Sequence, residues 1–407
     1  MGFLHAQQNL SEPYSRFGWG EIQSRSSSSV KGMGTTGYAF GDAVSVNTLN
    51  PASYTHFDSL SSIIDAAFSF RSHTLREEGR RQSGSTAYME YLYIGLPVTS
   101  RWATVFGIQP FSMVNYNYSM QDALCTRQDI GNGGTYEVFW GNAFDITSFL
   151  SVGLQASYLF GTTSRLHDLV FTDDSYVNSR SENEYSTSGL LLNAGLQIEI
   201  PLGAKKLGLG LTYTPSIPAL ISVKQSNFHM SYQVSGSSDN ILDTLAWSAE
   251  EKSVTRNSLT NPTTLGAGLS LSKKGHYWTG LDFTWTDWSN FSMGDNSDQL
   301  GDSYRISCGA RWIPKSNSSR YLQKITIIGG AFYEKDYVLQ HGVSLFRDGL
   351  DVGLSFPMRK SKTQISFYAE MGEYRLPDKS DGISEQYVTF TLQVQLHERW
   401  YQRRKLD

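Results

Sequence analysis

Residues 388–397 read VTFTLQVQLH, and the strict alternation in this stretch decides the fold class. Valine, phenylalanine or leucine occupies every second position, and threonine, glutamine or histidine occupies the positions between them. A period of two residues is typical of a β-strand with one apolar face. The same alternation returns in residues 64–70, 152–160 and 265–271. The sequence therefore predicts an all-β protein.

The connections distinguish the two folds that such strands build, a soluble β-sandwich and a transmembrane barrel. Short turns near residues 99–101 and 147–148 alternate with longer loops such as 118–133 and 216–261. This alternation and an even strand count are typical of outer-membrane barrels. We predict a closed 14-stranded antiparallel transmembrane β-barrel over residues 59–397, with both chain ends on the periplasmic side. Its strands are expected at 60–72, 86–98, 102–117, 134–146, 149–161, 185–200, 206–215, 262–272, 276–288, 302–313, 321–334, 345–356, 363–374 and 386–397.

The composition agrees with a protein that lies in the outer membrane of a Gram-negative bacterium. Only 18% of the 407 residues are charged, and the chain has 23 Tyr, 21 Phe and 9 Trp. No apolar run is long enough for a helical membrane span. Aromatic residues at predicted strand ends are expected in the interfacial girdles, namely Tyr116, Tyr118, Trp285, Trp288, Trp400 and Tyr401. The net charge of −4 gives no reason to expect nucleic acid, and membrane lipid is the expected surrounding.

The segment before the first strand is rich in Gly, Ser, Thr and Asn, and we expect it to form a plug, or hatch, inside the barrel. Residues 32–37 match a GxGxxG pattern, but a dinucleotide site needs a strand before it and a helix after it. We therefore interpret these glycines as turn and close-packing positions. The predicted organisation is a remnant of a signal peptide (1–6), an N-terminal segment with the hatch (7–58), the barrel, and a periplasmic C-terminal tail (398–407).

Two motifs resemble the long-chain fatty acid transporter (FadL) family. The tripeptide Asn50-Pro51-Ala52 follows the glycines of the hatch and resembles the NPA element of that family's hatch. A later hairpin is similar to that family's Pro-led GxG strand followed by a Trp-Gly-Asp-Trp-Trp strand, and the segment around residues 14–20 resembles the Bacteroidota branch. The residues that carry the resemblance are Gly32, Gly34, Gly37, Asn50, Pro51 and Ala52 in the hatch, and Pro262, Gly266, Gly268, Trp278, Asp282, Trp285 and Trp288 in the hairpin.

The resemblance implies uptake of small hydrophobic, fatty-acid-like molecules through a lumen that the hatch occludes. It also implies a kinked third strand that opens the wall sideways, and Gly107 and Pro110 lie in that strand. A plain bulge at these residues is the alternative, because Pro cannot donate to a ladder. Some relatives serve as accessory barrels, so a non-transporting subunit of an outer-membrane secretion or barrel-assembly machine is the alternative function. Loops 118–133 and 216–261 match nothing in the family, and the sequence does not identify a ligand.

The sequence does not predict an enzyme. Its eight histidines show no metal-ligand spacing, and it has no GxSxG nucleophile motif. No metal and no cofactor is expected. Asp282 is expected to face the lumen, where it contributes polarity or contacts the hatch. Cys125 and Cys308 are expected to be unpaired, although a disulfide stays open.

Overall fold

The computed structural model describes most of the chain. The predicted signal remnant, residues 1–6, lies outside the described part, as does the C-terminal tail beyond residue 399. The described ranges are 12–59, 61–77, 80–173, 175–217, 221–233, 243–246, 255–289, 291, 300–340, 342–359, 361–377 and 383–399.

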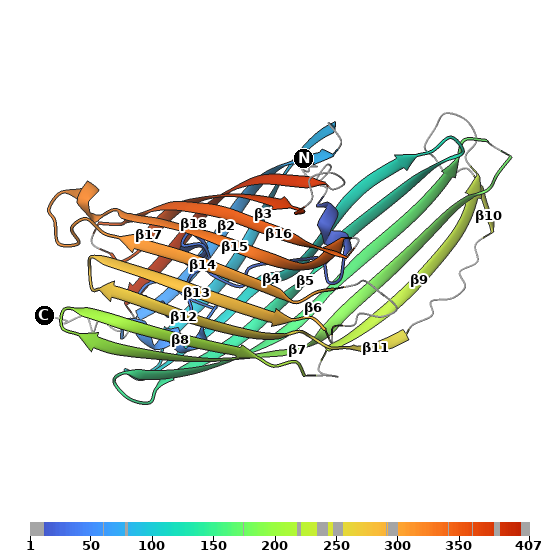
Figure 1. The fold of residues 1–407 in the computed structure, drawn as a ribbon. Helices are drawn as coiled ribbons and strands as arrows, with labels where there is room; N and C mark the ends of the chain where they lie inside the picture. The colour runs from blue at the N-terminus through green and yellow to red at the C-terminus, as the bar shows by residue number, and fades with distance from the viewer. Residues whose placement is uncertain are drawn as a thin grey trace, which may run out of the picture.

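Fourteen strands close into a ring in which every strand is antiparallel to both neighbours, as predicted (Figure 1). The ring closes where β18 pairs with β2, from Ser384↔Arg76 to Arg399↔Ser61. The strands of the ring are β2 (Ser61–Glu77), β3 (Arg80–Pro97), β4 (Trp102–Gln121), β5 (Cys125–Asp145), β6 (Leu150–Phe171), β7 (Asn178–Leu202), β8 (Lys205–Thr214), β12 (Thr263–Lys273), β13 (Tyr277–Asp287), β14 (Ser303–Trp312), β15 (Thr326–Gln340), β16 (Val343–Pro357), β17 (Gln364–Arg375) and β18 (Ser384–Arg399).

The remaining elements lie inside the ring, at its periplasmic rim or beyond its outer end. The inner elements are η1 (Pro13–Arg16), β1 (Glu21–Ile22), α1 (Ser28–Lys31) and η2 (Pro51–His56), and the rim holds η3 (Tyr321–Lys324). Beyond the outer end, β9 (Ile221–Gln233) pairs with the first half of β7 and with β10 (Asp243–Ala246) and β11 (Thr255–Leu259). None of the described helices is long and apolar enough to cross a membrane.

Several predicted outer loops are in fact continuations of strands. Residues 118–133 were expected to be a loop, but β4 runs to Gln121 and β5 begins at Cys125. Part of the expected loop 216–261 forms β9 to β11. Beyond the membrane both faces of a strand can be polar, so the alternation that reveals a strand disappears there. The wall from β4 to β7 therefore extends well past the outer end of β3 (Figure 1).

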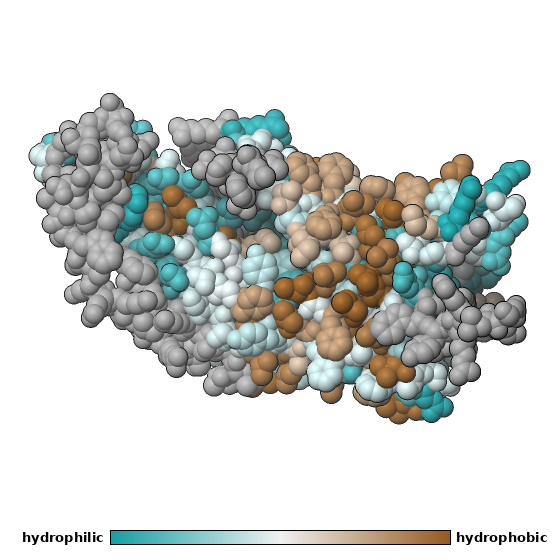
Figure 2. Space-filling view, turned by 180° about the vertical axis from the view of Figure 1, so that it is seen from behind, coloured by the Kyte–Doolittle hydropathy of each residue, from teal (hydrophilic) through white to brown (hydrophobic). Residues whose placement is uncertain are grey.

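The outer face of the ring carries a belt of exposed apolar side chains (Figure 2). They occupy alternate positions, as Phe68 and Phe70 do in β2. Ser69, which lies between these two, and Asp65, which lies before them, are buried and face the lumen. This is the dyad pattern of a strand between lipid and a polar interior. The predicted lipid-facing register of the strands is therefore correct.

Two of the six predicted girdle aromatics are buried inside the molecule, and Trp400 and Tyr401 lie outside the described residues. Tyr116 is 3% exposed and Trp288 is 5% exposed, and Trp288 stacks on Tyr337 with ring centroids 4.0 Å apart. The girdle prediction is wrong for these two residues. The prediction assumed that strand ends lie at the membrane surface. Instead, β4 continues past Tyr116, and Trp288, directly after β13, packs inward on Tyr337.

The N-terminal segment, residues 12–58, runs through the ring from the outer end to the periplasmic end. Glu12 donates its backbone N–H to the Asn115 carbonyl (2.7 Å) in the outer part of β4, whereas Phe57 directly precedes the periplasmic start of β2. Glu12, the first described residue, therefore lies at the outer end. The chain ends themselves, residues 1–11 and 400–407, lie outside the described residues, so the prediction that both ends are periplasmic stays a prediction. An even number of strands determines only that the first and last strands of the ring begin and end on the same side of the membrane. It does not locate the segment before the ring, which crosses the lumen to the outer end.

Candidate functional site

The lumen of the ring, with the N-terminal segment inside it, is the candidate site. Asp282 on β13 points inward and accepts the backbone N–H groups of Gly37 (2.6 Å) and Tyr38 (2.9 Å). The sequence predicted either lumen polarity or a contact with the hatch at this aspartate, and the geometry shows the contact. Two buried backbone donors are thus satisfied by one carboxylate, which ties the middle of the segment to the wall.

Glycines in the wall leave room for the segment to lie directly on the sheet. A Cβ atom on Gly266 would overlap the Tyr38 ring, and a Cβ on Gly268 would lie 2.8 Å from the Cβ of Tyr38. These are the two glycines of the predicted hairpin motif. Glycines that the sequence analysis did not single out do the same elsewhere: Gly153 faces the Pro51–Ala52 backbone, Gly195 faces Asn50, Gly210 faces the Tyr38 carbonyl, and Gly309 and Gly330 face Met33.

The NPA tripeptide fixes the beginning of η2 and joins it to the wall. The Asn50 side chain accepts the Ala52 N–H (3.0 Å) and so caps the helix. Its amide group donates to the carbonyl oxygens of Tyr38 (2.7 Å) and of Leu196 on β7 (3.1 Å). Pro51 occupies the first position of the helix, where no N–H is needed. Asparagine and proline are thus explained by backbone geometry alone.

The three predicted hatch glycines also lie inside the ring. Gly34 has φ +71°, a left-handed conformation that favours glycine, and it touches the backbone of Ala331 on β15. Gly32 lies against the ring of Tyr368, and Gly37 lies against Val30 of α1. These contacts agree with the interpretation of the glycines as turn and packing positions.

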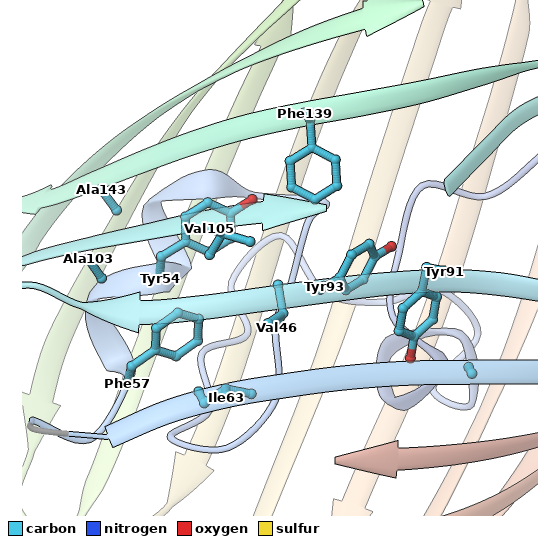
Figure 3. Packing of buried hydrophobic residues seen from close by; sticks show 11 residues of the cluster. Val46, Tyr54, Phe57, Ile63, Tyr91, Tyr93, Ala103, Val105, Phe139 and Ala143 are labelled. Carbon is cyan, nitrogen blue, oxygen red and sulfur yellow. The ribbon is translucent and has the colours of Figure 1, made fainter. Parts of the chain in front are cut away.

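The periplasmic half of the segment packs on the wall through apolar side chains (Figure 3). Tyr54 and Phe57 of the segment stack with their ring centroids 6.1 Å apart, and both are buried. The wall contributes residues from four strands, and Tyr91 and Tyr93 on β3 stack at 4.1 Å. Burial of each such side chain stabilises the closed lumen by about 1.5–3 kcal/mol.

The outer half of the lumen holds charged side chains instead. Arg71 on β2 forms ion pairs with Glu21 (2.8 Å), Glu385 (3.3 Å) and Glu12 (3.6 Å), and its side chain is 6% exposed. Burial and the neighbouring Glu21 carboxylate raise the pKa of Glu12. Burial opposes the ionisation of Glu21, but the Arg71 guanidinium outweighs it and lowers the pKa of Glu21 to about 2. Arg347 lies beside this cluster and pairs with Glu370 (2.8 Å).

Two cavities of about 50 Å³ each lie in the outer half, and charged or polar side chains form much of their lining. Sites for small organic ligands are usually about 300–1,000 Å³ and mostly apolar. These two cavities are therefore suited to water rather than to a hydrocarbon.

A larger cavity of about 450 Å³ lies at the periplasmic mouth, next to Phe40 and Trp278. Trp278 is one of the predicted motif residues, and it packs edge-on against Phe40 at 5.0 Å. Acidic groups that line this cavity are paired, since Asp42 contacts Arg311, and Glu199 contacts His56 (3.0 Å) and Lys206 (2.6 Å).

The predicted kink in the third strand of the ring, β4, coincides with the end of its pairing to β3. The ladder between β3 and β4 runs only from Pro97↔Ala103 to Leu92↔Ile108. The register to β5 shifts between Pro110 and Ser112, so a bulge lies where proline was expected to produce one. Toward the outer end of the barrel from this point, β3 and β4 are no longer paired, and we call the space between them the seam. Gly107 packs against Phe139 and Tyr93 at the base of the seam.

The remaining motif residues support the hairpin and the wall beyond it. Pro262 directly precedes β12, Trp285 is partly exposed, and the Trp288 indole donates to the Ser303 hydroxyl (3.1 Å). Among the described residues no group of three or more His, Cys, Asp or Glu side chains could hold a metal ion. Cys125 and Cys308 are both free thiols.

A family model described as BamG matches residues 1–407, the whole chain. The chain belongs to the BamG family. No curated protein matches this BamG-family barrel.

Solved structures similar to the BamG-family barrel are FadL-type outer-membrane channels. The CymD monoaromatic hydrocarbon channel is 14% identical, with a TM-score of 0.59, and the match covers 93% of this chain and 98% of that chain. A FadL homologue from Pseudomonas aeruginosa is 10% identical (TM-score 0.63, 94% and 100% covered), and the toluene transporter TbuX from Ralstonia pickettii is 13% identical (TM-score 0.60, 92% and 98% covered). At such identities the likeness shows the fold alone. The FadL-type barrel fold is confirmed, while the family that matches is BamG.

Proposed function

We propose that this protein is a non-transporting accessory barrel of an outer-membrane protein secretion or barrel-assembly complex in a Gram-negative bacterium. In this role the barrel is a rigid membrane-embedded scaffold, and its N-terminal segment is a permanent filling of the lumen. Uptake of hydrophobic molecules, the function that the resemblance to FadL implies, is the second candidate.

The observation that carries the proposal is the filled and charged outer lumen. A hydrophobic molecule that enters from outside would have to pass the Arg71 cluster, where three carboxylates surround one buried guanidinium. Separating such buried partners leaves uncompensated charge and costs about 3–5 kcal/mol. The two cavities beside the cluster are also far smaller than a usual ligand site. The match to the BamG family over the whole chain fits the same proposal.

Purification from native membranes in mild detergent tests the proposal. We expect stoichiometric partner proteins of the outer membrane to co-purify, and we expect mass spectrometry of the extracted sample to find no apolar ligand bound at one equivalent per barrel. A barrel that purifies alone with an apolar molecule in its lumen would contradict the proposal.

One observation favours the second candidate. The seam begins at the kink around Gly107 and Pro110, the residues expected at a lateral exit, and Met89 on the β3 side of the seam is exposed in the apolar belt. If the kink serves transport, Pro110→Ala should reduce uptake of a bound substrate identified in the purified barrel. Unchanged uptake would leave the kink as a plain bulge.

A further inference from the structure

The seam is bordered by the backbone edges of β4 and β3, and these two edges differ in whether another part of the chain pairs with them. On the β4 side the N-terminal segment adds a short strand, since β1 pairs through Glu21↔Met113 and Ile22↔Ser112. Gln23 extends this pairing by donating its N–H to the Phe111 carbonyl (2.9 Å), and Asn115 donates to the Ser15 hydroxyl (3.1 Å). The β4 edge is thus largely covered.

The β3 edge has no such cover within the described part of the chain. Residues 81–91 of β3 pair with β2 on one side, and no described strand pairs with them on the other. At the end of this edge nearest the ladder with β4, the Tyr91 hydroxyl accepts the Ser28 N–H (2.8 Å), but that contact uses the Tyr91 side chain and not the β3 backbone. The free edge is eleven residues long, roughly 35 Å at the rise of a strand.

The part of this edge around Ala87 and Met89 lies at the level of the apolar belt. Met89 is opposite Phe68 and Ala87 is opposite Phe70 in the β2–β3 ladder. Met89, Phe68 and Phe70 are 46%, 54% and 47% exposed. Backbone N–H and C=O groups that face hydrocarbon without partners cost several kcal/mol each, so a barrel normally has no free edge at this depth. Lipid tails cannot supply the missing hydrogen bonds.

We propose that the free edge of β3 is a docking edge for a β-strand of a partner outer-membrane protein, which adds to the sheet at the seam. A strand supplies the alternating donors and acceptors that the edge requires, and the same seam already accepts a strand, β1, on its other side. The exposed apolar side chains beside the edge require a partner that is itself integral to the membrane. This inference rests on the proposed accessory role and specifies the edge of β3 at which the partner protein binds.

Site-specific photo-crosslinking in native membranes tests the inference. A photoreactive amino acid is placed at Met89 or at Ser85, both of which point outward from β3. The matched control is Leu269 on β12, which is 45% exposed in the same belt but lies in a strand that is paired on both sides. We expect Met89 and Ser85 to crosslink to a protein that also co-purifies stoichiometrically, with the crosslink mapped to an edge strand of that protein. We expect Leu269 to give lipid adducts only.

The outcomes separate this inference from the proposed function. If partners co-purify but Met89 and Ser85 yield only lipid adducts, only crosslinks to a second copy, or only crosslinks within the same chain, the docking edge is wrong and the accessory role stands. If no partner co-purifies at all, the accessory role itself fails. A small hydrophobic molecule captured at Met89 instead of protein would overturn the docking edge and support lateral exit.

Discussion

Asp282 holds two backbone N–H groups of the N-terminal segment at the depth of the membrane. Asp282→Ala should leave both donors buried without acceptors, at about 1–3 kcal/mol each. We therefore expect a lower unfolding temperature in heat-modifiability gels and faster proteolysis of residues 30–57. Asp282→Asn keeps one acceptor oxygen and should lie between wild type and the alanine variant.

Asp173→Ala is the control for this experiment. Asp173 also accepts a backbone N–H, from Ser175 (2.9 Å), but it is exposed in an outer loop. The variant should unfold like wild type. Equal behaviour of the Asp282 and Asp173 variants would show that the contact with the segment does not stabilise the barrel.

Gly210 gives a steric test of the same packing. A Cβ atom here would overlap the Tyr38 carbonyl oxygen, a backbone atom that cannot move aside by changing rotamer. We expect Gly210→Ala to destabilise the barrel by about 1–3 kcal/mol, the usual cost of overpacking. In Gly329→Ala the new Cβ meets only the Asp351 carbonyl oxygen at 3.5 Å, an ordinary contact, so its unfolding should be close to that of wild type. An unchanged Gly210→Ala melting curve would mean that the segment does not lie on the sheet at Tyr38.

His56 gives the segment a pH-dependent anchor at the periplasmic mouth. Burial alone would lower the pKa of His56, but its hydrogen bond to Glu199 (3.0 Å) and that carboxylate's charge outweigh burial and raise the pKa. A raised folded-state pKa means that the stabilisation is fully present below the unfolded value of about 6.5 and is lost as pH rises through the folded-state pKa. We expect the melting temperature of the barrel to fall over that range in wild type.

His56→Gln should remove this part of the pH dependence, whereas His276→Gln, in an exposed turn at the same mouth, should keep it. Identical pH profiles for wild type and His56→Gln would refute the anchor.

The sequence predicted some residues of the lumen and missed others for a physical reason. Asp282 was predictable because the alternation of its strand places it on the lumen-facing side, where a carboxylate needs a hydrogen-bond donor. Gly153 and Gly195 did not stand out, because a glycine in a strand shows its purpose only when the chain that lies on it is known. The buried Arg71 cluster was missed likewise, since Glu12 and Glu385 are 373 positions apart and meet only in the closed ring.

At the scale of single elements, β3 is unusual because it is paired on both sides only over Leu92–Gly95. In the isolated barrel we expect alternate amides of residues 81–91 to exchange with solvent within minutes, because they face the seam. The amides of β13, which is paired along its length on both sides, should stay protected for hours. Hydrogen exchange followed by NMR measures both strands in one sample, and uniform protection of residues 81–91 would show that the edge is already covered.

The positions of the strands were predictable only where membrane surrounds them. Alternation located the lipid-facing parts of β6, β12 and β18, since one face there must be apolar. It failed for residues 118–133, where β4 and β5 continue with polar side chains on both faces. The kink at Pro110 was predictable because proline lacks a backbone N–H. The seam was not predictable, because the sequence of one strand does not show where its pairing with the neighbouring strand ends.

At the scale of the whole molecule, the barrel, the inserted segment and the charged outer lumen together predict a channel that does not conduct. In planar bilayers the wild-type protein should show no steady ion current. Arg71→Met removes the cation from between Glu12, Glu21 and Glu385 and leaves their buried carboxyl groups without a cationic partner, so we expect the outer half of the segment to detach and intermittent currents to appear. Arg101→Met, in an exposed periplasmic turn, is the matched control and should stay silent. Steady conductance of the wild-type barrel would contradict both the closed lumen and the accessory role that is proposed from it.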